Sequence, residues 1–157
     1  MTKRTSSLAT AAGNGNAELG LLEEMVGFNL RRAYNRAAQL FTRAFEDLDL
    51  APIQFAALEF ISKNPGTCQK DIAHHIGTTP PALVAPLERL ERRGWIVRSK
   101  GPADRRRTRV NLAPDGQKRM HEVEKRIHAV DHELVAELSE GERARLLRLL
   151  QKVAETS

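Results

Sequence analysis

The sequence contains little that would indicate a secreted or membrane-bound protein. It has one cysteine, Cys68, which excludes an internal disulfide framework and suits a reducing cytoplasm. No apolar run approaches the roughly 20 residues that a membrane-spanning helix needs, so we expect no membrane partner. The N-terminus carries Lys3 and Arg4 without a following apolar core, and we therefore expect no secretory signal. These absences together predict a cytoplasmic protein.

Aromatic residues are also scarce, at 4% of the chain, whereas hydrophobic residues make up 41%. We therefore expect a core built mostly of leucine, alanine, valine and isoleucine. A chain of 157 residues is long enough for one domain with a real core, and two full domains would be cramped. Residues 1–17 are rich in Ser, Thr, Gly and Asn, and they predict a flexible tail.

Motifs of catalysis are missing as well. The sequence has no glycine-rich phosphate loop, no nucleophile elbow and no paired acids with a basic partner. We therefore expect neither an enzyme nor a bound cofactor.

Positive charge is what the sequence does contain. Its net charge of +5 favours an anionic partner such as nucleic acid. The stretch "SKGPADRRRTRVNL", residues 99–112, places Arg105, Arg106, Arg107 and Arg109 against Asp104 alone. Because closely spaced like charges repel, we expect the balancing negative charge to come from outside the chain.

Hydrophobic periodicity predicts a mainly α-helical protein with one β-hairpin. Apolar residues recur at three- and four-residue steps in the segments 18–48, 52–63, 68–76, 80–93, 114–138 and 140–154. Ser139 and Glu142 have the spacing of a capping box before the last helix. The stretches "WIVRSK" and "RTRVNL" alternate instead and flank turn residues, so residues 95–112 are expected to form a hairpin.

Two of the predicted helices have the spacing of a helix-turn-helix. The first has Thr67 as its expected N-cap, and a tight turn at Gly77 separates it from the second. Thr79 can cap the second helix, whose leucines at 83, 87 and 90 are expected in the core. Pro86 lies within this helix and should cost about 3 kcal/mol or kink it.

A helix-turn-helix followed by a basic hairpin is a winged helix. The stretch "LERLERRGWIVRSKGPADRRRTRVNLAPDG" and the long helices on both sides resemble the MarR family of bacterial transcriptional regulators over residues 19–154. An Asp-x-Arg pattern of the family's wing falls here on Asp104 and Arg106. The family's Leu-Thr-x-x-Gly pattern reads Leu112 to Gly116, with Ala113 in place of the hydroxyl cap.

The resemblance implies a division of the chain and a set of DNA contacts. It assigns residues 18–50 and 114–155 to dimerisation and 51–113 to a domain that binds double-stranded DNA. Arg106 is expected in the minor groove, with Arg105 and Arg107 on flanking phosphates and Asp104 paired to a neighbouring arginine. The second helix should enter the major groove by its N-terminal end. Its expected contacts are Thr78, Thr79, Pro81, Ala82, Ala85 and Arg89.

The resemblance also implies a homodimer in which the terminal helices of two subunits interleave. The sequence fits this expectation, because Leu19, Leu21, Leu22 and residues 146–150 are more apolar than the ends of one small domain need to be. Two-fold symmetry predicts a pseudo-palindromic operator, with half-site centres about 34–36 Å apart.

Members of the family usually release DNA when a small ligand, often an aromatic acid, binds between the dimer helices and the winged domain. Residues 28–45 contain four arginines and no acid, and Asn29, Arg32, Arg36 and Arg43 share one helical face. One interpretation is a site for an anionic aromatic effector, either a free carboxylate or an acyl-CoA thioester. The aromatic residues that could pack against its ring are Tyr34, Phe41, Phe55 and Phe60. The other is ordinary ion pairing with Glu133, Glu137 or Glu140.

Other kinds of sensing remain alternatives. Cys68 precedes a predicted helix, a position that can activate a thiol, although peroxide sensors of this family carry their cysteine near the first long helix. His128 and His132, four residues apart and close to His121 and Glu124, could bind zinc, but surface histidines and no metal are the preferred interpretation. A winged helix used only for contact with other proteins is the more remote alternative.

Overall fold

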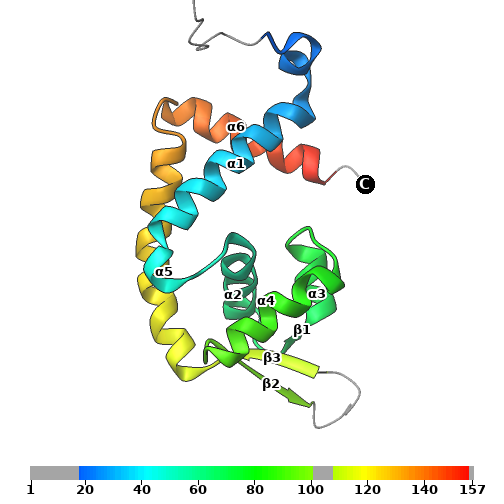
Figure 1. The fold of residues 1–157 in the computed structure, drawn as a ribbon, viewed down its shortest axis with the longest axis vertical. Coiled ribbons are helices and arrows are strands. Elements are labelled where there is room, and N and C mark those ends of the chain that lie inside the picture. The colour runs from blue at the N-terminus through cyan, green and yellow to red at the C-terminus, as the bar shows by residue number, and fades with distance from the viewer. Residues whose placement is uncertain (1–17, 101–107, 156–157) are drawn as a thin grey trace, which may run out of the picture. The chain divides into compact units, whose positions relative to one another are not determined.

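The computed structural model describes residues 18–100 and 108–155. Figure 1 shows the order of the elements along the chain. They are the 3-10 helix η1 (Gly20–Glu24), α1 (Val26–Ala44), the 3-10 helix η2 (Glu46–Leu48), α2 (Pro52–Lys63), β1 (Thr67–Cys68), α3 (Gln69–His75), α4 (Pro80–Arg92), β2 (Ile96–Lys100), β3 (Thr108–Leu112), α5 (Pro114–Leu134) and α6 (Glu140–Ala154). The chain divides into two compact units, one ending at Ala33 and one beginning at Tyr34.

The N-terminal unit corrects the prediction of one continuous helix over residues 18–48. Gly20 has a φ of +53°, and Met25 is extended, so η1 stops before α1 begins at Val26. The side-chain amide of Asn29 donates to the carbonyls of Glu23 and Met25, at 2.9 and 3.0 Å, and stabilises this break. A second interruption follows Ala44, where η2 leads to Asp49 in the left-handed region.

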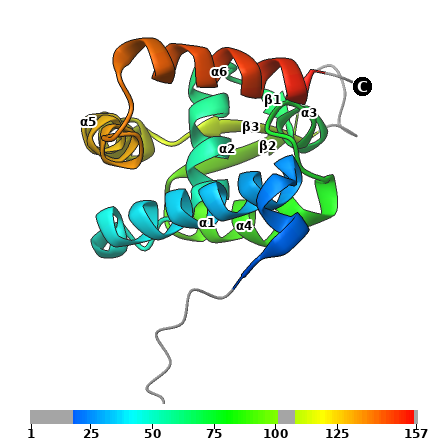
Figure 2. The same cartoon turned by 90° about the horizontal axis from the view of Figure 1, so that it is seen from above.

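The second unit contains a winged helix built from α2, α3, α4 and a small antiparallel sheet. The strand order is β1-β3-β2, with Ile96 opposite Leu112 and Lys100 opposite Thr108. Helix α2 packs against β3, and Figure 2 shows α2 beside the sheet from above. The predicted hairpin is thus confirmed, and the fold class is mainly α with a β-hairpin wing.

Strand β1 was not predicted. Thr67, expected as an N-cap, instead pairs with Val110, and Cys68 pairs with Arg109. Because the backbone of these two residues extends the sheet, α3 begins only at Gln69, with Cys68 as its N-cap.

Helix α4 confirms the prediction of its buried face. Leu83, Leu87 and Leu90 are 0% exposed and belong to the same core as Trp95. The helix runs through Pro86 without interruption.

The start of α5 is fixed to the hairpin by a close backbone approach. A Cβ atom at Gly116 would lie 2.0 Å from the carbonyl oxygen of Trp95, so only glycine fits there. The same oxygen accepts a hydrogen bond from the amide of Ala113, the N-cap of α5. Ala113 makes no side-chain capping hydrogen bond. Backbone contacts therefore hold the start of α5 in place of the hydroxyl cap of the family pattern.

Helix α6 begins with the predicted capping box, formed by Ser139 and Glu142. None of its residues is buried. Within the described part of the chain, no helix is both long and apolar enough to cross a membrane.

Candidate nucleic-acid interface and effector site

The N-terminal end of α4 presents small side chains to solvent. Thr79, Pro81, Ala82 and Ala85 are exposed, and Thr78 is half-buried. Thr79 has N-cap backbone geometry but makes no side-chain capping hydrogen bond, so its hydroxyl is not used to hold the helix. This surface has the shape that a major groove accepts, a helix end without bulky side chains.

A hydrogen bond that the sequence did not predict sets the start of α4. The side-chain amide of Gln69, the first residue of α3, donates to the carbonyl of Pro80 at 2.7 Å. Because Pro80 is the first residue of α4, this bond joins the N-terminal ends of the two helices of the helix-turn-helix.

The other end of α4 is held by Asp49. Arg89, predicted to contact DNA, forms an ion pair with the carboxylate of Asp49. Arg93 lies 3.7 Å from the same carboxylate and donates to the carbonyls of Asp49 and Leu48, at 2.7 and 2.5 Å. The side chain of Arg89 is still 50% exposed, and its role in DNA contact stays a prediction.

The tip of the wing, with Asp104, Arg105, Arg106 and Arg107, lies outside the described residues. The strands that lead to it are anchored. Arg109 donates to the carbonyl of Gly66 at 3.0 Å, and Arg98 pairs with Glu91 at 3.3 Å. Arg98 and Arg109, at the base of the hairpin, therefore have partners within the chain.

An apolar cavity of about 180 Å³ lies between α1, α2 and α5. Its lining residues are Tyr34, Ala37, Ala38, Phe41, Pro52, Ile127, Val130, Asp131 and Leu134. Tyr34 and Phe41 were both predicted ligand contacts. Phe55, a third predicted contact, is not part of the lining, and its ring lies 5.7 Å from that of Phe41. Phe60, the fourth predicted aromatic contact, does not line this cavity either; its ring stacks on that of His75, with 4.9 Å between the ring centres.

The arginine face of α1 contains the ion pairs that the sequence left as an alternative. Glu133 on α5 lies 2.6 Å from Arg43 and 4.0 Å from Arg36. A second cavity of about 270 Å³ is lined by Arg43, Arg126 and Glu133 among others. Arg36 and Arg43 are therefore paired, and Arg43 lies beside a space large enough for a small anion.

Two of the predicted ligand residues, Asn29 and Arg32, belong to the N-terminal unit. The guanidinium carbon of Arg32 lies 5.8 Å from the ring centre of Phe28, and the amide of Asn29 holds the break before α1.

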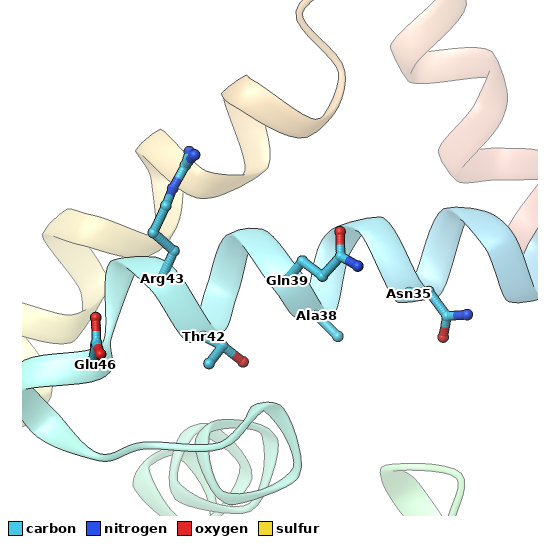
Figure 3. A pocket seen from close by; sticks show the side chains of 6 residues that line it. All are labelled: Asn35, Ala38, Gln39, Thr42, Arg43 and Glu46. Atoms are coloured by element: carbon cyan, nitrogen blue, oxygen red, sulfur yellow. The ribbon is translucent and has the colours of Figure 1, made fainter. Parts of the chain in front are cut away.

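An open groove along α1, of about 600 Å³, was not predicted. It is lined by Asn35, Ala38, Gln39, Thr42, Arg43 and Glu46. Figure 3 shows Arg43 leaving the helix on the side opposite to Ala38 and Thr42. Because α1 and Glu46, the first residue of η2, supply the whole lining, the groove is a shallow surface and not an enclosed site.

A charged contact ties the segment after α1 to α5. Arg126 donates to both carboxylate oxygens of Asp47, at 2.8 and 2.9 Å. This hydrogen bonding lowers the pKa of Asp47 and raises that of Arg126. Nearby, the hydrogen bond to Asp131 raises the pKa of Arg143 in the same way.

The structure places the residues of the alternative thiol and metal sites as follows. The thiol of Cys68 donates to Asp71 at 3.0 Å. Among residues 18–100 and 108–155, no group of three or more His, Cys, Asp or Glu side chains is placed to hold a metal ion.

Comparison with known proteins agrees with this geometry. A model of the MarR family matches residues 48–107. A putative transcriptional regulatory protein for the hcr operon of Thauera aromatica is 31% identical over 90% of this chain and 87% of its own.

Solved structures give the same result. The structure of the transcriptional repressor CouR bound to a 23-mer DNA duplex has a TM-score of 0.83 to this chain. The two chains are 32% identical, and the match covers 90% of this chain and 100% of that one. The structure of CouR bound to p-coumaroyl-CoA has a TM-score of 0.80 to this chain. Its protein chain is 30% identical, and the match covers 89% of this chain and 99% of that one. BpsR of Bordetella bronchiseptica, whose DNA binding is regulated by 6-hydroxynicotinic acid, is 27% identical, with a TM-score of 0.81 over 91% and 100%.

The winged helix, the long helices that flank it and these relatives together identify a DNA-binding transcriptional regulator. The chain belongs to the MarR family, and it is a transcriptional repressor of the MarR type.

Proposed function

We propose that this protein is a cytoplasmic repressor that a small anionic aromatic effector releases from a pseudo-palindromic operator. The observation that carries the proposal is the apolar cavity between α1, α2 and α5, lined by Tyr34 and Phe41. Its volume of about 180 Å³ suits a single aromatic ring. The repressors CouR and BpsR, which have the same fold, respond to or bind aromatic compounds of this kind.

Arg36 and Arg43 are proposed to receive the negative charge of the effector. Both pair with Glu133, and their side chains are 56% and 66% exposed. Exposed ion pairs of this kind contribute at most about 1 kcal/mol, so an effector anion can replace Glu133 at little cost. A carboxylate needs one such arginine, whereas the phosphates of a CoA thioester can use several.

On the DNA side, α4 is proposed to enter the major groove and the wing to follow the minor groove. Thr79, Ala82 and Ala85 are the exposed groups at the helix end, and Arg106 is the proposed minor-groove residue. If each complex neutralises about 6–10 phosphates, affinity should fall by about 10³–10⁵-fold between about 50 and 200 mM salt.

A homodimer is proposed as the binding unit. Leu146, Leu147 and Leu149 on α6 are 39%, 46% and 52% exposed. Apolar side chains gathered on one helix in this way indicate a surface that another chain covers.

The first test is a mobility-shift titration on DNA from upstream of the protein's own gene. p-Coumaroyl-CoA, p-coumarate and 6-hydroxynicotinate are added as probes. Release by the thioester alone favours phosphate recognition, and release by a free acid favours a carboxylate site. Tight binding that resists every probe, together with release by an oxidant or a chelator, would replace the aromatic effector with thiol or metal sensing.

The arginine assignment is tested in the same assay. The double variant Arg36→Ala with Arg43→Ala should keep its operator affinity and lose its response to the active probe. Lys118→Ala, which removes an exposed cation at the start of α5, serves as the control. A full response in the double variant would contradict the role of these arginines.

A further inference from the structure

The segment between α1 and α2 contacts two helices that have different tasks. Asp47, near its start, bonds Arg126 of α5 through both carboxylate oxygens, at 2.8 and 2.9 Å. Asp49, two residues later, pairs with Arg89 of α4 and with Arg93, the C-cap of that helix. One short segment thus joins α5, which lines the cavity, to the proposed recognition helix.

Backbone geometry makes this connection stiff. Asp49 is the one non-glycine residue with positive φ among those described, at +42°, a conformation that aspartate tolerates better than most residues. The carbonyls of Leu48 and Asp49 both accept from Arg93. A movement of the segment must therefore move the end of α4, or break several contacts at once.

Residues that flank the segment on both sides line the cavity. Phe41 lies one turn before it, Pro52 directly follows it, and Ile127 is the neighbour of Arg126. A ring that entered the cavity would contact these three lining residues, which flank the segment and its partner Arg126.

We propose that Asp49 is a positioning residue that sets the orientation of α4 for the operator and, with Asp47, transmits the state of the cavity to that helix. This inference rests on the proposed function. Asp49 touches neither DNA nor effector, and it acts through Arg89 and Arg93. Its side chain is 60% exposed, so its pairs add little to stability and their role is to orient.

The first experiment compares Asp49→Asn with Asp115→Asn. Both changes remove one negative charge, and Asp115 pairs only loosely with Lys118, at 3.9 Å. Asparagine also tolerates the backbone conformation of residue 49. Affinity is measured for the operator and for an unrelated duplex of equal length, at one ionic strength, and thermal unfolding is recorded for each protein.

The expected result is that Asp49→Asn lowers the ratio of specific to non-specific affinity by about 2- to 30-fold, with little change in unfolding temperature. Asp115→Asn should leave the ratio unchanged. If Asp49→Asn strengthens binding to both duplexes equally, Asp49 acts only as a competing charge and the positioning role is wrong. A fall in ratio that merely follows a fall in unfolding temperature would also overturn it.

Transmission from the cavity is tested without a ligand. Ala37 lines the cavity, so Ala37→Phe, or the smaller Ala37→Leu if folding is impaired, fills it from within. We expect either change to weaken operator binding about 10-fold in the native background, and by less than about 2-fold when Asp47→Asn or Asp49→Asn is also present.

Equal weakening in all backgrounds, or none in the native one, would overturn the transmission while leaving a DNA-binding repressor intact. Absence of any operator preference in the native protein would instead contradict the proposed function itself.

Discussion

Helices α4 and α6 are both rich in leucine, yet the leucines are buried in α4 and exposed in α6. Leu83, Leu87 and Leu90 of α4 are 0% exposed. On α6, Leu149 is 52% and Leu150 37% exposed, and no residue of the helix is buried. The leucines of α4 recur every three or four residues on one face, and that face is covered by the core of the winged helix.

The difference shows that α4 completes its packing within the chain, whereas α6 does not. α4 finds its apolar partners within the chain. α6 keeps an apolar surface that a monomer has no reason to maintain, because exposed leucines on one helix favour association. The winged helix therefore has a core that is complete within the chain, whereas the exposed leucines of α6 agree with the proposed homodimer.

The largest effect is expected inside the winged helix. Leu87→Ala should lower the free energy of unfolding by about 2–5 kcal/mol, because it removes a fully buried side chain and leaves a cavity. Urea unfolding measures this loss, which should not depend on protein concentration. Leu149→Ala is the control, and in dilute protein it should change stability by no more than about 0.5 kcal/mol. Equal losses in dilute protein would mean that α6 packs within one chain.

A smaller effect is expected at α6. Leu149→Asp should weaken self-association at least about 10-fold, close to 1.4 kcal/mol, because it places a charge in an apolar contact. Light scattering over a range of concentrations measures it, with Gln117→Asp on the exposed start of α5 as the control. A native protein that stays monomeric throughout the range would contradict the proposed dimer.

Sequence patterns between neighbouring residues predicted the features that lie within one helix or one hairpin. The periodicity of α4, its buried leucines, the hairpin alternation and the capping box at Ser139 all act between residues close in the chain. The break at Met25 escaped prediction because apolar spacing continues across it, while the backbone of Gly20 and Met25 does not. Strand β1 escaped because two residues carry no pattern, and only pairing with β3 defines them.

The candidate site was less predictable, since it depends on contacts between distant residues. The sequence indicated Tyr34 and named Glu133 as an alternative partner for the arginines, because charge counting is local. It did not indicate that Asp47 meets Arg126 or that Asp49 meets Arg89, contacts that span 79 and 40 positions. Phe60 was assigned to the ligand by residue type, and packing against His75 places it elsewhere.

The smallest effects are expected from substitutions at the N-caps of α6 and α4, which are Ser139 and Thr79. Ser139 accepts from the amide of Glu142 at 3.4 Å, and the Glu142 carboxylate accepts from the amide of Ser139 at 2.8 Å. Ser139→Ala should therefore cost about 1 kcal/mol of unfolding free energy. Thr79 makes no such bond, so Thr79→Ala should change stability by only a few tenths of a kcal/mol and act instead on operator affinity.

The pH dependence separates the two caps further. The Ser139 side chain lowers the pKa of Glu142 below its ordinary value of 4.5. A lowered pKa means that the cap stabilises the fold fully above pH 4.5 and loses its effect as pH falls through the lowered value. Urea unfolding at about pH 7 and about pH 3 should show the cost of Ser139→Ala shrinking in acid, while that of Thr79→Ala stays small at both. A cost that is the same at both pH values would mean that the serine caps α6 without help from the carboxylate.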